Sequence, residues 1–327
     1  MTQVTSQSWL QPDWPKPAQQ WVNRSLGELD YQVIGSLALI KGWSLGYVYK
    51  QKTNKGDVFF KATASLPLFS NESQLCATLY DLFPNAIATT LAYEPRQQWL
   101  LTADFGTAFV DTVPLSDWAL PFNVFAKLQQ RSIQHLDKLI DSGCIQRDIR
   151  NLPDQLTAMF ANDNITARLP KDMPQSAAQI SEVMTKLTQQ INALLQLGLP
   201  NTLVHSDLHI ENIAPNTALA TEPASEPFIY FDWSDACISH PFIDGTYVFR
   251  MEKTPAKQQI VQAYLSQWQS YADMEALHEA WHLAEGICYA HQAVSYGAMN
   301  HILDHDMDLL HAFENAFRRF MVNLLNK

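Results

Sequence analysis

Between residues 31 and 63 the chain carries clusters of β-branched and aromatic residues, separated by short polar stretches. This pattern is typical of β-strands. Gly42 and Gly46 lie between two such clusters, and Asn54-Lys55-Gly56 lies between the next two, so both places are predicted to be turns. The segment is therefore expected to form strands joined by tight turns.

Residues 70–83 change to the spacing of an amphipathic helix, with leucines three and four positions apart on one face. Ser70 or Asn71 is the expected N-cap of this helix. Residues 86–93 and 97–103 return to a strand-like pattern, which predicts two more strands.

After about residue 110 the pattern is mostly helical. Residues 122–143 and 176–198 are each expected to form a long amphipathic helix that ends near a glycine, and residues 255–327 are expected to form further helices. Short strand-like pieces, residues 202–207 and 227–233, lie between the second and third of these segments. A strand-rich segment thus precedes a larger helical one.

Length and composition agree with a globular protein of two domains. Of the 327 residues, 47% are hydrophobic and 17% are charged, which is far from the composition of a disordered chain. Because the pattern of hydrophobic residues changes from strand-like to helical after residue 103, we expect an N-terminal domain over residues 1–103 and a C-terminal domain over residues 104–327.

The net charge of −11 argues against nucleic acid or an anionic membrane as a partner. No stretch is apolar and long enough to span a bilayer. The four cysteines are too far apart for a metal knuckle or a redox pair, and such scattered thiols suggest a reducing cytoplasm. We therefore expect a cytoplasmic protein, whose oligomeric state the sequence does not indicate.

The strongest chemical signal is LVHSDLHIENI, residues 203–213, in which His205, Asp207 and Asn212 have the spacing H-x-D-x-x-x-x-N. Downstream, the strand-like sequence FIYFDW ends in Asp232 and a tryptophan. A chance match in a loop could explain the three spaced residues alone, but the apolar strand before Asp232 argues against chance. The polar stretch between the two motifs, residues 213–227, is expected to be a surface loop.

Together these motifs resemble the aminoglycoside phosphotransferase and choline kinase superfamily, a group of kinase-like small-molecule phosphotransferases. Its loop commonly reads H-G-D-x-x-x-x-N, and Ser206 stands here in place of the glycine. The resemblance covers most of the chain. It implies an α+β, two-lobe protein-kinase-like fold with a small antiparallel-sheet N-lobe, a larger and mainly helical C-lobe, and the nucleotide in the cleft between the lobes.

The resemblance also implies a role for each motif residue. Asp207 would orient an acceptor hydroxyl and take its proton, while Asn212 and Asp232 would hold Mg²⁺, a cation that prefers oxygen ligands. His205 would support the loop. Asp244, in SHPFIDGTYVF, matches an aspartate that braces the same loop, although an ordinary helix N-cap is the alternative interpretation.

Lys61 lies in an otherwise apolar strand, DVFFKA, where a charged group needs a partner. By resemblance, Glu72 in the first turn of the next helix is that partner, and Lys61 contacts the nucleotide phosphates. The alternative is an edge-strand lysine and a solvated glutamate. The glycine-containing turn around Ser44 could bring backbone N–H groups close to the phosphates, although any hairpin turn looks similar.

Asp104, Phe105 and Gly106 match the Asp-Phe-Gly tripeptide whose aspartate binds magnesium in protein kinases. Chain order argues against that role, because the metal-binding aspartate of this architecture follows the catalytic loop and Asp104 precedes Asp207. This position corresponds to the hinge between the lobes. There, by resemblance, the carbonyl of Thr102 and the amide of Asp104 would pair with the adenine edge.

Residues 278–282, HEAWH, match the H-E-x-x-H signature of zinc proteases. The longer metzincin signature would require a glycine at Glu285 and a histidine at Cys288, so it fails at both positions. An apolar stripe runs along this segment and the two histidines flank it; its members are Leu277, Trp281, Ala284 and Cys288. We interpret the segment as an amphipathic helix whose histidines lie on its surface or in a groove, and not as a zinc-protease site.

These patterns predict a kinase that uses ATP (or GTP) and Mg²⁺ to phosphorylate a hydroxyl of a small molecule. The alternatives are a nucleotide-binding protein without turnover, a sugar or nucleoside kinase, and a protein kinase. An excess of 33 acidic over 22 basic residues favours a cationic acceptor, such as an amino alcohol or an aminoglycoside. Aromatic and acidic residues of the C-terminal half could hold such an amine: Trp268, Trp281, Tyr289, Tyr296, Glu275, Glu279 and Glu285.

Overall fold

The computed structural model describes residues 14–173, 176–217 and 226–325. The chain divides into two compact units, and each unit combines separate segments of the sequence. Unit 1 comprises residues 1–111, 137–144 and 210–235, and unit 2 comprises residues 112–136, 145–209 and 236–327. Because the units interleave along the chain, a single boundary after residue 103 does not describe this division.

Unit 1 contains a five-stranded antiparallel sheet with the strand order β1-β2-β3-β5-β4. Its strands are β1 (Val33–Trp43), β2 (Gly46–Thr53), β3 (Gly56–Thr63), β4 (Thr90–Glu94) and β5 (Trp99–Ala103). The strands and turns predicted over residues 31–63 are therefore confirmed. The strand predicted over residues 86–93 is shifted, because only Ile87 of its first part makes a bridge, and that bridge is with Tyr230.

The helices of unit 1 are α1 (Pro15–Glu28), α2 (Glu72–Leu82) and most of α4 (Leu136–Asp141). Asn71 is the N-cap of α2, since its side chain accepts a hydrogen bond from the backbone N–H of Gln74. A second, two-stranded sheet consists of β8 (Ile213–Pro215) and β9 (Phe228–Tyr230). The predicted surface loop is thus wrong at its start, which is β8, and its residues 218–225 lie outside the described residues.

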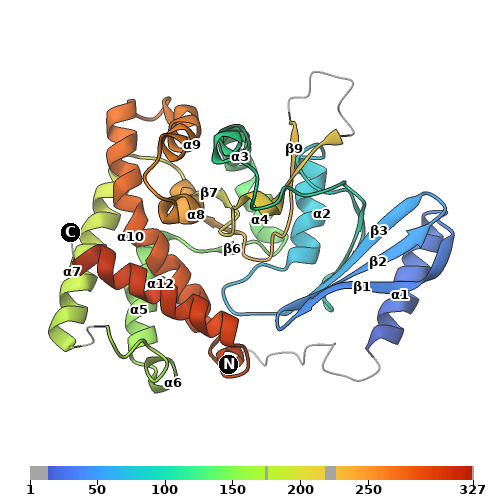
Figure 1. The fold of residues 1–327 in the computed structure, drawn as a ribbon, viewed down its shortest axis with the longest axis horizontal. Helices are drawn as coiled ribbons and strands as arrows, with labels where there is room; N and C mark the ends of the chain where they lie inside the picture. The colour runs from blue at the N-terminus through green and yellow to red at the C-terminus, as the bar shows by residue number, and fades with distance from the viewer. Residues whose placement is uncertain (1–13, 174–175, 218–225, 326–327) are drawn as a thin grey trace. The chain divides into compact units, whose positions relative to one another are not determined.

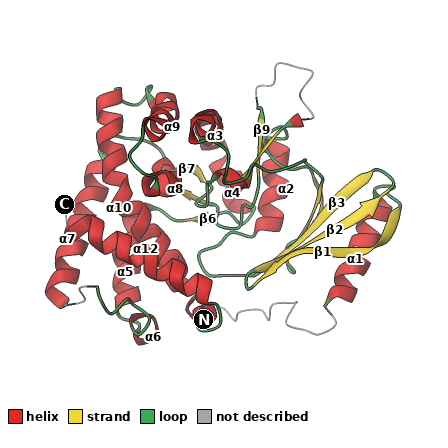
Figure 2. Ribbon diagram, viewed as in Figure 1, coloured by secondary structure: helices red, strands yellow, loops and turns green. Residues whose placement is uncertain are grey.

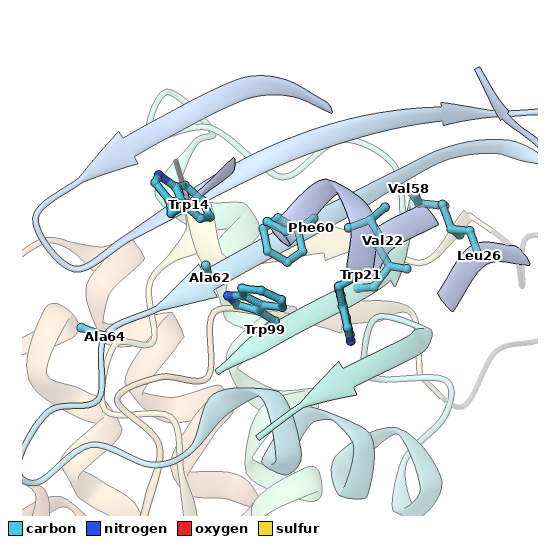
Figure 3. Close-up of a cluster of buried hydrophobic side chains, with 11 residues drawn as sticks. Trp14, Trp21, Val22, Leu26, Val58, Phe60, Ala62, Ala64 and Trp99 are labelled. Carbon is cyan, nitrogen blue, oxygen red and sulfur yellow. The ribbon is translucent and has the colours of Figure 1, made fainter. Parts of the chain in front are cut away.

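The core of unit 1 lies between α1 and the five-stranded sheet (Figures 1 and 3). Alternate residues of β3 point into it, and Val58, Phe60 and Ala62 are almost completely buried. The ring of Trp99 from β5 lies 5.7 Å from the ring of Trp21 from α1 and 5.8 Å from that of Phe60. These contacts explain why the strand-like segments are rich in aromatic residues.

Unit 2 is mainly helical, as Figure 2 shows, and α10 and α12 pack side by side within it. Its helices are α3 (Ala119–Ser132), α5 (Leu152–Phe160), α6 (Asp163–Thr166), α7 (Ala177–Leu195), α8 (Thr246–Arg250), α9 (Pro255–Leu265), α10 (Met274–Ala298), α11 (Asn300–Leu303) and α12 (Met307–Leu325). A small sheet contains β6 (Ile145–Gln146), β10 (Cys237–Ser239) and β7 (Thr202–Val204), in that order. The predicted α+β class, with an antiparallel sheet followed by helices, is confirmed.

The helices predicted over residues 176–198 and 255–327 are confirmed, but the helix predicted over residues 122–143 is interrupted. A 3₁₀ turn, Ile133–His135, separates α3 from α4. Just before it, the hydroxyl of Ser132 donates to the carbonyl of Gln129 and accepts the N–H of Leu203. Side-chain bonds of this kind compete with the helical backbone pattern, which explains the interruption. Among the described helices, none combines the length and apolar character needed to cross a membrane.

An aromatic cluster forms the core of unit 2. The ring of Trp281 in α10 lies 4.6 Å from Phe249, 5.5 Å from Phe242 and 5.4 Å from Tyr264. The stripe predicted along this helix is buried as expected, and the exposure of its four members ranges from 0 to 3%. The HEAWH segment therefore belongs to a core helix.

We predict that Gly245→Ala destabilises unit 2. A Cβ atom at this glycine would lie 2.6 Å from ring atoms of both Phe249 and Trp281, which are held in the aromatic cluster. Overpacking of this kind costs about 1–3 kcal/mol of unfolding free energy. Denaturant unfolding measures the change. The matched control is Gly27→Ala, because no atom lies within 4 Å of the added methyl there. Equal stability of the two variants would contradict the predicted clash.

Candidate active site

In unit 1, the structure brings Lys61, Glu72 and Asp232 together. Nζ of Lys61 lies 2.7 Å from Oε1 of Glu72 and 2.6 Å from Oδ1 of Asp232. Lys61 comes from β3, Glu72 from the first turn of α2, and Asp232 from the residues after β9. The strand β3 lies between β2 and β5, and the side chain of Lys61 is only 14% exposed. The interpretation of Lys61 as an edge-strand lysine is therefore excluded.

The charge of Lys61 is strongly favoured in this cluster. Burial of the ammonium opposes the charge, but Asp232 and Glu72 outweigh burial and raise the pKa of Lys61 above its ordinary value. Glu72 is held by a second donor, since the backbone N–H of Trp233 donates to Oε1 at 3.0 Å. The cluster thus presents a fixed positive charge between two carboxylates, on a rigid strand.

Asn212 and Asp232 are placed by the two strands β8 and β9. Asn212 directly precedes β8, and the backbone N–H of Phe231 donates to the carbonyl of Asn212 at 3.2 Å. The antiparallel pairing therefore brings the residue before β8 next to the residues that follow β9. An amide oxygen and a carboxylate are hard donors, and Mg²⁺ at phosphates is typically bound by only one or two protein ligands of this kind. The donor set fits that ion.

In unit 2, Asp207 follows β7 and is held by two donors. The hydroxyl of Tyr247 donates to Oδ1 at 2.7 Å, and Nε2 of His209 lies 3.5 Å from Oδ2. Burial acts to raise the pKa of Asp207, but His209 and Tyr247 outweigh burial and lower the pKa below its ordinary value. Asp207 is therefore ionised at neutral pH and its orientation is defined.

Asp244 braces the backbone of this loop. Its Oδ1 accepts the N–H of Ser206 at 2.8 Å, and its Oδ2 accepts the N–H of His205 at 3.1 Å and the side-chain amide of Gln129 at 2.8 Å. Burial raises the pKa of Asp244, while these N–H donors act in the opposite direction. The N-cap of this turn is His240, so the alternative interpretation of Asp244 as an N-cap is excluded.

Two residues at the site have backbone angles that favour glycine. Ser206 has a φ of 64° and Asp232 has a φ of 65°. Left-handed conformations of this kind are uncommon for residues other than glycine, and such strain is often found at functional sites. Ser206 takes the position of the glycine in H-G-D, and its N–H bond to Asp244 helps to hold the strained conformation.

The turn between β1 and β2 contains Ser44, whose hydroxyl oxygen is buried and has no hydrogen-bond partner among the described residues. Close packing explains why the two neighbouring positions in this turn, 42 and 46, are glycines. A Cβ atom at Gly42 would lie 2.7 Å from the ring of Tyr47, and one at Gly46 would lie 2.6 Å from the carbonyl oxygen of Ala62. A phosphate role for the turn therefore depends on Ser44 and the backbone rather than on the glycines.

The predicted hinge residues are less accessible than expected. Thr102 lies inside β5, which has β3 on one side and β4 on the other. The backbone N–H of Asp104 donates to the carbonyl of Asp57 at 3.3 Å, and the side chain of Asp104 accepts the N–H of Gly106. The Asp104 side chain therefore caps a local turn, and it has no contact with Lys61.

Beyond Asp104 the ring of Phe105 packs on Phe231, with 4.8 Å between the ring centroids. Three buried aliphatic residues complete a small apolar cluster under these rings: Ala88, Ala214 and Ile229. All five residues belong to unit 1, and Phe231 directly precedes Asp232. The cluster therefore adjoins two candidate metal ligands along the chain, because Phe231 precedes Asp232 and Ala214 follows Asn212 by two positions.

The HEAWH histidines line a hollow of about 1200 Å³ in unit 2, between the end of α8, α9 and α10. Nε2 of His278 lies 3.2 Å from Oε1 of Gln262. The described residues contain no group of three or more His, Cys, Asp or Glu side chains arranged to hold a metal.

We predict that purified protein carries no stoichiometric zinc, because HEAWH lacks a credible third ligand. Elemental analysis of the protein after dialysis measures the metal content. One tightly held zinc ion per chain, lost in His278→Ala, would support the protease interpretation instead.

Most of the side chains that suggested a cationic acceptor lie in the core, on the surface of α10 or beside α9. Trp268 and Trp281 are core residues with 0% and 3% exposure. Glu275 and Glu279 are exposed on α10, and Glu285 lines the hollow beside α9. Tyr289 is buried further along α10. Tyr296, which is half-buried, interacts electrostatically with Tyr247, the residue whose hydroxyl donates to Asp207.

Sequence analysis missed three residues that hold the site in unit 2. His209 and Tyr247 contact the carboxylate of Asp207, and Gln129 contacts that of Asp244. The sequence could have indicated His209, because it lies two residues after Asp207 in the same motif. No such signal exists for Gln129, because it comes from α3 and is brought to Asp244 only by folding.

The fold is that of known small-molecule kinases. No family model and no curated protein matches the sequence. Among solved structures, the choline kinase LicA from Streptococcus pneumoniae has a TM-score of 0.61 at 12% identity, with 95% of this chain and 100% of that chain covered. An ethanolamine kinase from Plasmodium vivax has a TM-score of 0.60 at 11% identity, with 96% of this chain and 89% of that chain covered.

A third structure, the complex of APH(2")-IIia with GDP and kanamycin, has a TM-score of 0.60 at 11% identity and covers 94% of this chain and 99% of that chain. At such low identity these similarities establish the fold of the chain. The predicted kinase-like fold is therefore confirmed.

Proposed function

We propose that this protein belongs to the aminoglycoside phosphotransferase and choline kinase superfamily and transfers the γ-phosphoryl group of ATP or GTP to a hydroxyl of a small molecule. The observation that carries the proposal is the cluster of Lys61, Glu72 and Asp232. It supplies a paired lysine from a central strand and a carboxylate after the catalytic loop, as phosphoryl transfer in kinases requires.

Unit 1 would bind the nucleotide. Lys61 would contact the phosphates, and Ser44 would donate its buried hydroxyl to one of them. The cluster of Phe105 and Phe231 would hold the base by apolar contact. Because the amide of Asp104 is bonded to Asp57, we place the backbone groups that pair with the base after residue 104 instead of at Thr102 and Asp104.

Asn212 and Asp232 would hold Mg²⁺, which supplies charge neutralisation for the nucleotide phosphates when bound. Asp207 would accept a hydrogen bond from the acceptor hydroxyl and take its proton. The bond from the acceptor oxygen to the γ-phosphorus then forms, the bond from the γ-phosphorus to the bridging oxygen breaks, and the nucleoside diphosphate leaves. His205 and Asp244 would position Asp207 through the loop backbone without touching the substrate.

The likeness of the fold to a choline kinase and an ethanolamine kinase supports a small molecule as the acceptor, but it does not identify it. A cationic acceptor remains compatible with the net charge of −11, and a sugar-like acceptor with the fold.

The test is a coupled assay of ADP release with ATP, GTP and a panel of hydroxylated metabolites, with and without Mg²⁺. We expect turnover that requires Mg²⁺ and at least one acceptor. Magnesium-dependent nucleotide binding without turnover on any acceptor would favour the non-catalytic alternative, and the absence of nucleotide binding would reject the proposal.

A further inference from the structure

Tyr247 and Arg250 lie three positions apart on α8, so their side chains leave the same face of the helix. The hydroxyl of Tyr247 donates to Oδ1 of Asp207 at 2.7 Å. The guanidinium carbon of Arg250 lies over the ring of Tyr247, 4.7 Å from its centroid. Tyr247 therefore contacts both the guanidinium of Arg250 and the carboxylate of Asp207, and all three residues belong to unit 2.

Arg250 has few partners of its own. One of its terminal nitrogens donates to the side-chain oxygen of Gln292 in α10. Its Nε is buried and has no hydrogen-bond partner in the described part of the chain. None of the ion pairs formed by described residues includes Arg250. The direct contacts of its guanidinium among the described residues are therefore with a neutral amide and an aromatic ring, and none is with a carboxylate.

An arginine in this situation is suited to an anionic ligand. A buried N–H donor normally has a hydrogen-bond partner, and the Nε of Arg250 has none among the described residues, although the residue as a whole is half-buried. The planar fork of N–H donors matches a carboxylate or a phosphate in a bidentate way. No carboxylate forms an ion pair with Arg250 among the described residues: Asp207 is separated from the guanidinium by the ring of Tyr247, Glu252 is exposed, and Glu285 lines the hollow beside α9.

We infer that Arg250 binds an anionic group of the acceptor, so that the acceptor is a hydroxylated small molecule with a carboxylate or a phosphate rather than an amine. This inference rests on the proposed function, because it assumes that the acceptor hydroxyl meets Asp207. It makes Arg250 the residue that decides between acidic and basic acceptors.

The test measures the thermal unfolding midpoint of the protein saturated with Mg²⁺ and the non-hydrolysable analogue AMP-PNP. Four three-carbon probes of similar size are added in turn: glycerate, glycerol phosphate, glyceramide and aminopropanediol. In the wild type, we expect glycerate or glycerol phosphate to raise the midpoint by at least about 1 °C near saturation, and the neutral amide and the amine to have no effect. The two anions together show whether the group is a carboxylate or a phosphate.

Arg250→Gln should lose the rise, and Arg250→Lys, which keeps the charge without the fork, should retain part of it. The control Arg96→Gln removes the same charge from the exposed turn between β4 and β5 and should keep the full rise. Arg250→Gln should also bind Mg²⁺ and AMP-PNP as the wild type does, which shows that it is folded.

The inference is overturned by a rise with aminopropanediol alone, by an anion effect that persists in Arg250→Gln, or by no anion effect in the wild type. A weakened affinity of Arg250→Gln for AMP-PNP would assign the guanidinium to the nucleotide phosphates and overturn it as well. Failure of the proposed function gives a different result, because the wild type would then bind no AMP-PNP. In that case the same anions are titrated without nucleotide, and the comparison of wild type with Arg250→Gln still measures whether Arg250 binds them.

Discussion

Asp207→Asn is expected to lower kcat by roughly 10²–10⁴-fold, the range typical for loss of a general base. The substitution keeps the shape of the side chain and an acceptor for the Tyr247 hydroxyl, which bonds Oδ1 at 2.7 Å. It removes the charge that would orient the acceptor hydroxyl and take its proton. Nucleotide affinity should change by less than about twofold, because the lysine and the candidate metal ligands belong to unit 1. Steady-state kinetics and nucleotide titration measure the two effects.

The control for this variant is Asp141→Asn, which makes the same chemical change at an exposed position of α4 and should leave kcat unchanged. A further variant, Tyr247→Phe, tests the environment of the carboxylate. Because Tyr247 and His209 lower the pKa of Asp207, loss of the hydroxyl should move the acid limb of the pH profile of kcat to higher pH. If Asp207→Asn keeps more than about a tenth of the wild-type kcat, Asp207 has no role in the chemical step.

Asp232→Ala is expected to weaken magnesium-dependent nucleotide binding by more than about 100-fold, a loss of about 2.8 kcal/mol. The carboxylate of Asp232 is one of the two oxygen donors that we assign to Mg²⁺, and it also pairs with Lys61 at 2.6 Å. The variant should still fold, because Lys61 keeps its 2.7 Å pair with Glu72 and the side chain of Asp232 is 37% exposed. Calorimetric titration of AMP-PNP with and without Mg²⁺ measures the loss.

Asp104→Ala is the matched comparison for this second prediction. Asp104 lies in the Asp-Phe-Gly tripeptide, but its side chain only accepts the N–H of Gly106 at 2.9 Å. We expect its loss to change nucleotide affinity by less than about threefold, since one exposed hydrogen bond contributes about 1 kcal/mol or less. Should Asp104 be essential and Asp232 dispensable, the assignment of the metal ligands would be wrong.

Most of the candidate site could be predicted because its signals are local in the sequence. The spacing of His205, Asp207 and Asn212 lies within one short stretch of sequence, and the strand-like sequence FIYFDW, which contains Asp232, is six residues long. The pairing of Lys61 with Glu72 could be inferred because a charge in a central strand requires a partner, and the structure shows the two in contact.

The misplaced elements share a different cause. The helix predicted over residues 122–143 is interrupted where Ser132 bonds to Leu203, a residue far away in the sequence. Likewise, the start of the loop after Asn212 forms a strand because β9 pairs with it. The strongly periodic helix α7 was predictable, since its buried residues follow the 3.6-residue repeat. The first half of α10 shows the same repeat, whereas its second half is buried at ten consecutive positions.

By itself, the sequence determined the class of the fold, the order of its elements and the residue types of the candidate catalytic loop and metal ligands, because these depend on residues within a few positions of one another. Only the tertiary structure decided which distant side chains complete the site. Gln129 reaches Asp244 and Tyr247 reaches Asp207. Three of the four aromatic residues thought to face an amine, Trp268, Trp281 and Tyr289, pack into the core. Contacts of this kind depend on how helices pack, and packing leaves no periodic signal at any single position.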